Sequence, residues 1–92
     1  MRVRYTQQSR RKIEEIGRYL RSRDPAALTV RADIQVALML IADHPKAGRA
    51  IGRGLRRYVV PRLPYLILYR IDEQAGAIAV AIIRHASRRP LG

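Results

Sequence analysis

Arginine and histidine side chains at two places in the chain could act on a phosphodiester bond. Arg62 lies in a proline-flanked turn, and Arg84 and His85 are adjacent near the carboxyl end. Arginine can neutralise the charge that develops on a phosphate, while histidine or tyrosine can transfer protons. RNA cleavage by Arg62, Arg84 and His85 is therefore the one enzymatic chemistry that the sequence supports. His85 is also typical of a surface histidine at the end of a strand.

The residues needed for other active-site chemistries are missing. The chain has no cysteine, only two separated histidines and no HExxH sequence, so we expect no metal site and no cofactor. No serine, histidine and acidic residue occur at spacings that suggest a nucleophilic triad. Residues 46–54, KAGRAIGRG, lack the GKS or GKT ending of a phosphate-binding P-loop. We therefore predict a flexible basic loop there.

The chain is strongly basic. Nineteen lysines and arginines against seven acidic residues give a formal net charge of +12 over 92 residues. Such a charge attracts anionic partners such as nucleic acid, the ribosome, a membrane surface or an acidic protein. A GC-rich genome would also enrich arginine, but it leaves the net charge unexplained. No helix-turn-helix signature is apparent, so we do not expect this chain to read a DNA sequence by itself.

The length allows a single domain over residues 1–92, with one hydrophobic core. No apolar run approaches the roughly 20 residues that span a bilayer, and the first residues lack the apolar segment of a signal peptide. We therefore expect a soluble, cytoplasmic protein that does not contact the membrane.

Two strands around a proline-marked turn are the predicted centre of the fold. They cover residues 55–60 and 65–71, with the turn at 61–64. In the second strand, alternate side chains are apolar on both faces, which is typical of a central strand covered on both sides. Residues 77–83 form a third strand of the same kind, and residues 2–5 alternate as a half-exposed strand does.

Two amphipathic helices are predicted between the first strand and this pair. Thr6 or Ser9 can cap the first helix, and Asp24 with Pro25 should begin the second, which runs to about residue 43 or 44. The apolar stripe of the first helix comprises Ile13, Ile16 and Leu20, and that of the second comprises Val30, Ile34, Ala37, Leu38 and Ile41.

The apolar surface of the second helix is wider than one sheet face requires. Leu28, Val36 and Leu40 extend its stripe. Part of this surface could therefore serve a partner. All of it could also be internal core, because the domain is small.

Four stretches of the chain, in order, resemble the ParE branch of the RelE/ParE superfamily of bacterial toxins. They are YTQQSRRKIEEIGRYL, HPKAGRAIGRGLRRYVV, RLPYLILYRID and IIRHASRRP, and the resemblance as a whole extends over nearly the whole chain. The resemblance implies an α+β fold of order β-α-α-β-β-β, with a helical hairpin packed on a small twisted antiparallel sheet. This agrees with the periodicities described above.

The resemblance also implies a type II toxin-antitoxin toxin that is neutralised by a cognate ParD-like antitoxin. Such a toxin reaches operator DNA only through the antitoxin complex. A wide apolar stripe beside basic residues would suit an acidic antitoxin. The residues expected to bind it are Ile13, Ile16, Leu20, Val30 and Ile34.

Two mechanisms occur among toxins that resemble this chain. RelE-like members cleave messenger RNA on the ribosome, often with an arginine at the position that Leu66 occupies here, and many have a tyrosine near the carboxyl end. This chain has no aromatic residue after His85. ParE-like members inhibit DNA gyrase and need no catalytic residue, and the resemblance favours them; a RelE-like endoribonuclease using Arg62, Arg84 and His85 is the alternative. The residues expected to contact the target are Arg62, Tyr65, Arg84, His85, Arg88 and Arg89.

Overall fold

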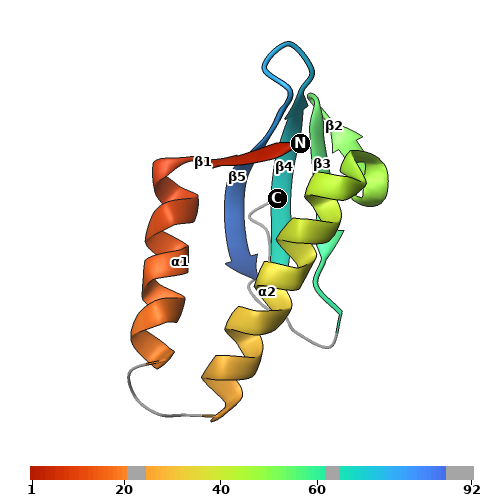
Figure 1. Ribbon diagram of the computed structural model, residues 1–92. Helices are drawn as coiled ribbons and strands as arrows, with labels where there is room; N and C mark the ends of the chain where they lie inside the picture. Colours follow the sequence, from red (N-terminus) through yellow and green to blue (C-terminus); the bar gives the residue numbers. More distant parts are fainter. Residues whose placement is uncertain (21–24, 62–64, 87–92) are drawn as a thin grey trace.

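The two helices of the chain lie on one face of a five-stranded sheet (Figure 1). The computed structural model describes residues 1–20, 25–61 and 65–86. The elements are β1 (Arg2–Tyr5), α1 (Gln7–Leu20), α2 (Pro25–Asp43), the short 3-10 helix η1 (Pro45–Ala47), β2 (Arg49–Gly52), β3 (Leu55–Val59), β4 (Tyr65–Asp72) and β5 (Ala77–His85). The predicted α+β class is confirmed, with a helical hairpin packed on a small sheet.

The sheet is mixed rather than antiparallel. Its strand order is β1-β5-β4-β3-β2, and β1 pairs with β5 in parallel. The other three pairs, β2 with β3, β3 with β4 and β4 with β5, are antiparallel. In each of them, strands that are consecutive in the chain are neighbours in the sheet. The prediction of an antiparallel sheet was therefore wrong for β1. β1 and β2 form the two edges of the sheet, and the helical hairpin connects them along the chain. β1 lies at the edge beside β5.

A strand replaces the loop that was predicted for residues 46–54. β2 pairs antiparallel with β3, and its register shifts between Ala50 and Gly52. Gly52, Arg53 and Gly54 all have positive φ angles, of 101°, 55° and 74°. The glycines therefore form the tight turn of a β-hairpin, because glycine adopts this backbone conformation without steric cost.

β4 lies at the centre of the sheet and carries much of the core. Ile67 and Tyr69 are fully buried on its helix-covered face, where they join Ile34 and Ile41 of α2 in one cluster. On the other face Leu68 is buried, but Leu66 is half-buried and Arg70 is exposed. The prediction of a strand covered on both sides was thus right for the helix face and only partly right for the opposite face.

Thr6 fixes the start of α1 against β5. Its hydroxyl oxygen accepts a hydrogen bond from the Ser9 amide at 3.2 Å and donates one to the Ala81 carbonyl at 2.6 Å. The Thr6 amide also donates to the Val80 carbonyl at 3.1 Å. Of the two residues predicted to cap α1, Thr6 or Ser9, Thr6 is therefore the one that does so. Ala81 lies where the pairing of β4 with β5 is irregular, so Thr6 satisfies a carbonyl beside that irregularity.

Candidate functional site

Tyr65 and His85 form an aromatic pair at the end of the sheet. They are the first residue of β4 and the last residue of β5, and they lie opposite each other across the two strands. Their ring centroids are 5.3 Å apart with an interplanar angle of 70°, an edge-to-face contact. Such contacts contribute about 0.5–1.5 kcal/mol beyond the burial of area. The structure thus brings together two of the residues predicted to contact the target.

Arg84 projects from the opposite face of the sheet. It lies across from Leu66, one residue away from the Tyr65–His85 pair. Neighbouring side chains of a strand point to opposite faces, so Arg84 and His85 diverge. The Arg84 Nε atom is buried and has no hydrogen-bond partner among the described residues. The set predicted for a nuclease is therefore divided between two faces.

Three further residues of the predicted target surface are Arg62, Arg88 and Arg89. They lie outside the described residues. Their places relative to the Tyr65–His85 pair remain predictions from the sequence.

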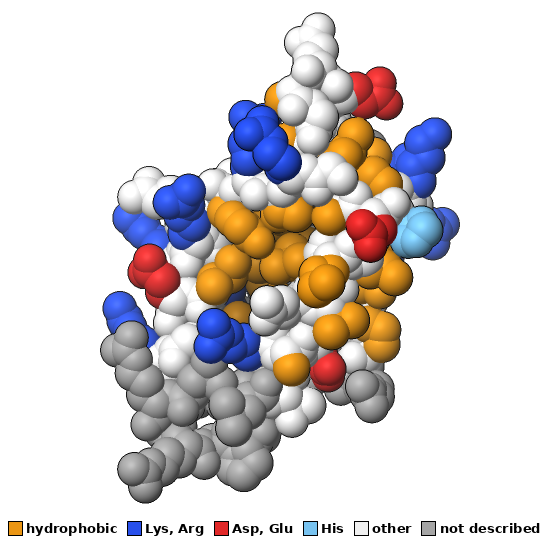
Figure 2. Space-filling view, in the orientation of Figure 1, with side chains coloured by type: hydrophobic (Ala, Val, Ile, Leu, Met, Phe, Trp, Pro, Cys, Tyr) orange, Lys and Arg blue, Asp and Glu red, His pale blue; other side chains and the backbone are white. Residues whose placement is uncertain are grey.

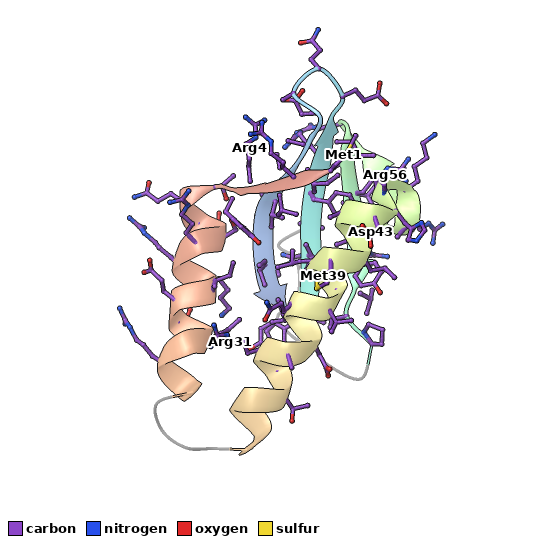
Figure 3. All side chains as sticks on the ribbon, in the orientation of Figure 1. Met1, Arg4, Arg31, Met39, Asp43 and Arg56 are labelled. Carbon is purple, nitrogen blue, oxygen red and sulfur yellow. The ribbon has the colours of Figure 1, made fainter. Side chains whose placement is uncertain are left out.

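A small pocket opens between α1 and α2. It is lined by Ile13, Ile16, Arg31 and Ile34, three of which were predicted to bind an antitoxin. Hydrophobic side chains gather between the two helices (Figure 2), and Arg31 of α2 lies beside this opening (Figure 3). We call these four residues the interhelical groove. Apolar walls with one cation at the edge suit an amphipathic, acidic segment.

Most of the predicted antitoxin residues also belong to the core. Ile16 and Ile34 are only 6% and 5% exposed, and they pack in the central cluster. Ile13 and Val30 are half-buried and pack against that cluster. The Leu20 side chain lies outside the described part of the structure. Ile16 and Ile34 therefore contribute mainly to the internal contact between helices and sheet, and their part in antitoxin binding stays a prediction.

The outer side of α2 leaves apolar side chains in solvent. Val36 is 63% exposed, Met39 62% and Leu40 39%. A shallow pocket on this side is lined by Val36 and Leu40 together with Tyr58 and Pro61. Val36 and Leu40, which widen the apolar stripe of α2 in the sequence, are thus exposed at the protein surface. Met39, Tyr58 and Pro61 were missed; the run VALMLIA lacks a polar side, which was the available signal for Met39.

Most charged side chains of α1 are exposed, although Lys12 is only 21% exposed. Arg11 and Arg18 are exposed, and Lys12 makes an ion pair with Glu15 at 3.4 Å, one turn further on. Pairs of this spacing at a surface contribute only about 0.2–0.5 kcal/mol. On β1, burial raises the pKa of the Tyr5 phenol above its ordinary value. The raised pKa favours the protonated phenol, and the Tyr5 ring packs against the core cluster.

The described residues contain no cluster of three or more histidine, cysteine, aspartate or glutamate side chains that could hold a metal ion. Neither described helix combines the length and the apolar character needed to cross a membrane.

Comparison with known proteins identifies the family. The family described as "ParE toxin of type II toxin-antitoxin system, parDE" matches residues 3–90. The chain is also 38% identical over 82 residues to the "Putative toxin Y4kP" of Sinorhizobium fredii, which covers 86% of this chain and 84% of that protein.

Solved structures share the fold. The isolated RelE toxin of E. coli has a TM-score of 0.73 at 13% sequence identity, covering 98% of this chain and 88% of that one. The chromosomal ParDE system of P. aeruginosa also has a TM-score of 0.73, at 20% identity, covering 95% and 97%. The match of the ParE toxin family over residues 3–90, together with the identity to the toxin of S. fredii, shows that the chain belongs to the ParE toxins of type II toxin-antitoxin systems.

Proposed function

We propose that this toxin inhibits DNA gyrase without cleaving a substrate, and that it acts in the cytoplasm. The observation that carries the proposal is the divergence of Arg84 and His85 to opposite faces of the sheet. A general acid-base site needs its proton carrier and its phosphate-binding cation around the same bond. Leu66, beside Arg84, supplies no cation at the place where the RelE-like arginine was expected.

The target surface proposed here is the end of the sheet formed by β4 and β5. The Tyr65–His85 pair gives it a fixed aromatic contact, and Arg84 adds a cation on the reverse side. Arg62, Arg88 and Arg89 extend this surface in the proposal. Aromatic and arginine side chains are the residue types that most often dominate the binding energy of protein interfaces.

The proposed second partner is a cognate ParD-like antitoxin. An amphipathic segment of it would enter the interhelical groove, with its apolar side against Ile13 and an acidic side chain near Arg31. Recognition of the operator sequence would be supplied only through this complex. The solved ParDE system, which shares the fold, supports an antitoxin partner for this chain.

Two assays on the purified chain test the target. One measures gyrase supercoiling with a readout for cleaved DNA, and the other measures messenger RNA cleavage on translating ribosomes. We expect inhibited supercoiling and intact RNA. His85→Ala should raise the concentration for half inhibition at least about tenfold, the cost of about 1.4 kcal/mol of binding.

The control variant is Arg11→Gln, which removes an exposed charge from α1 and should leave inhibition unchanged. Cut RNA with unaffected gyrase would overturn the proposal. It would direct attention to Arg62, Arg84 and His85 as residues of an endoribonuclease.

A further inference from the structure

Arginines are spread over the sheet face that the helices leave open. Residues opposite each other on neighbouring strands project to the same face. One row across the open face contains Arg49, Arg57, Leu68 and Ile82, and the next contains Leu55, Arg70, Ala79 and Arg4. A third row contains Val59, Leu66 and Arg84. We call Arg4, Arg49, Arg57, Arg70 and Arg84 the arginine face.

This face has little internal charge compensation. Asp72 is the only acidic residue in the described strands, and it is bound to Arg4 at 2.8 Å. Arg49 and Arg57 lie directly opposite each other on β2 and β3, and neither has an ion pair among the described residues. Like charges at opposed positions destabilise a sheet, so an anion bound there would relieve a repulsion that is present in the free protein.

Among the residues with described side chains, none on the open face is aromatic. The four tyrosines with described side chains, Tyr5, Tyr58, Tyr65 and Tyr69, all pack on the helix side, in or against the core cluster. Aliphatic side chains such as Leu66 and Val59 lie between the arginines instead. Proteins that hold single-stranded nucleic acid stack its bases on aromatic rings. A face with cations and no rings suits the backbone of a duplex, whose bases are already stacked.

We propose that the arginine face binds the phosphodiester backbone of duplex DNA without reading its sequence. This deepens the proposed function and rests on it, because the supercoiling reaction of gyrase has duplex DNA as its substrate. Contacts from the arginine face to the DNA would add to contacts from the Tyr65–His85 end of the sheet to the enzyme. The two sets of contacts would together hold the toxin on the gyrase–DNA complex.

Fluorescence anisotropy of the full chain with a short labelled duplex, in the absence of gyrase, tests this inference over a range of salt concentrations. The test variant is Arg57→Gln with Arg70→Gln. The matched control is Arg11→Gln with Arg18→Gln, which removes the same charge from exposed positions on α1. Thermal unfolding of both variants checks that each is folded.

We expect the sheet variant to weaken duplex binding at least about tenfold. It should also reduce the slope of log affinity against log salt by about 2, since each lost phosphate contact accounts for about 0.9 of that slope. The α1 control should change the affinity less than about threefold. Equal losses in the two variants would overturn the inference, because binding would then follow net charge alone.

Competition experiments with other anions test whether duplex DNA is the preferred ligand of the arginine face. Tighter binding of single-stranded RNA with the same loss in the sheet variant would overturn the assignment to duplex DNA. Displacement of the duplex by polyglutamate at a similar concentration of charge would instead indicate an acidic protein. Failure of DNA binding with gyrase inhibition intact would refute this inference alone, whereas DNA binding with unaffected gyrase would refute the proposed function.

Discussion

The hydroxyl of Tyr69 accepts a hydrogen bond from the Gly48 amide at 2.8 Å. It also donates one to the Pro45 carbonyl at 2.6 Å. The buried centre of β4 therefore holds the connection between α2 and β2. The carbonyl of Gly48 is satisfied as well, because Arg56 Nη1 donates to it at 2.7 Å. A Cβ atom at position 48 would lie 2.6 Å from the Tyr69 hydroxyl oxygen, so the contact requires glycine.

We predict that Gly48→Ala lowers the free energy of unfolding by about 1–3 kcal/mol, because the added methyl group must displace a ring that is fixed in the core. Tyr69→Phe should cost a similar amount, about 1–3 kcal/mol, because it leaves the Gly48 amide without its partner. Urea unfolding followed by circular dichroism measures both.

Gly17→Ala is the matched control for Gly48. Apart from its chain neighbours and the backbone of its own helix, no atom lies within 4 Å of a Cβ placed at Gly17, which is inside α1. Alanine should stabilise the protein there by about 0.5–1 kcal/mol, since glycine is the poorer helix former. A similar loss at both positions would show that the Tyr69 contact is not the cause.

We predict that Thr6→Ala costs about 1–2 kcal/mol of stability. The substitution removes the cap of α1 and leaves the Ala81 carbonyl without its hydroxyl donor. Thr6→Ser keeps the hydroxyl and should recover most of the loss in the same unfolding measurement. If serine were no better than alanine, the methyl group of Thr6 would be the stabilising part.

We predict that Arg31→Glu weakens antitoxin binding about tenfold or more, because it places an anion beside the interhelical groove. The loss should be larger at low salt, where exposed charges are less screened. Isothermal titration with the purified antitoxin at two salt concentrations measures it. Arg11→Glu makes the same charge reversal on α1 outside the groove, and an equal loss there would rule out a local contact at Arg31.

We predict that Tyr5 contributes to the loss of stability in alkali. Burial raises the pKa of its phenol above 10.0 in the folded state, so the folded protein holds this proton more tightly than the unfolded chain does. The contribution is fully present below the unfolded pKa and declines as the pH rises through the folded pKa. Tyr5→Phe should flatten this decline in urea unfolding measured from about pH 9 to pH 11, around the ordinary tyrosine pKa. An unchanged decline would contradict the assignment.

The strands were predictable where burial imposes a period on the sequence. The ranges predicted as 55–60 and 65–71 agree with β3 and β4 to within one residue at each end. β2 was missed because all four of its side chains are exposed, so no alternation marks it. The strand predicted at residues 77–83 extends to His85 as β5. Because Arg84 and His85 are consecutive residues of this strand, their side chains project to opposite faces of the sheet.

The pattern of the sequence could not predict which strands pair with each other. Alternation tells which side chains share a face of one strand, but the neighbouring strand and its direction depend on packing of the whole domain. The parallel partner of β1 and the arginine face both depend on such pairing. Likewise, an apolar stripe on a helix does not show which of its side chains are buried in the core. Ile16 and Ile34 are two that are buried.

The parallel pairing of β1 with β5 has a consequence for synthesis of the toxin. Ribosomes make β1 before β5, which is the strand partner of β1 in the described part of the chain and follows about seventy residues later, from Ala77 onward. Contacts between such distant parts of a chain form slowly and only after the intervening chain exists. The growing polypeptide therefore cannot complete its sheet, or the aromatic end of β4 and β5, until synthesis has passed His85.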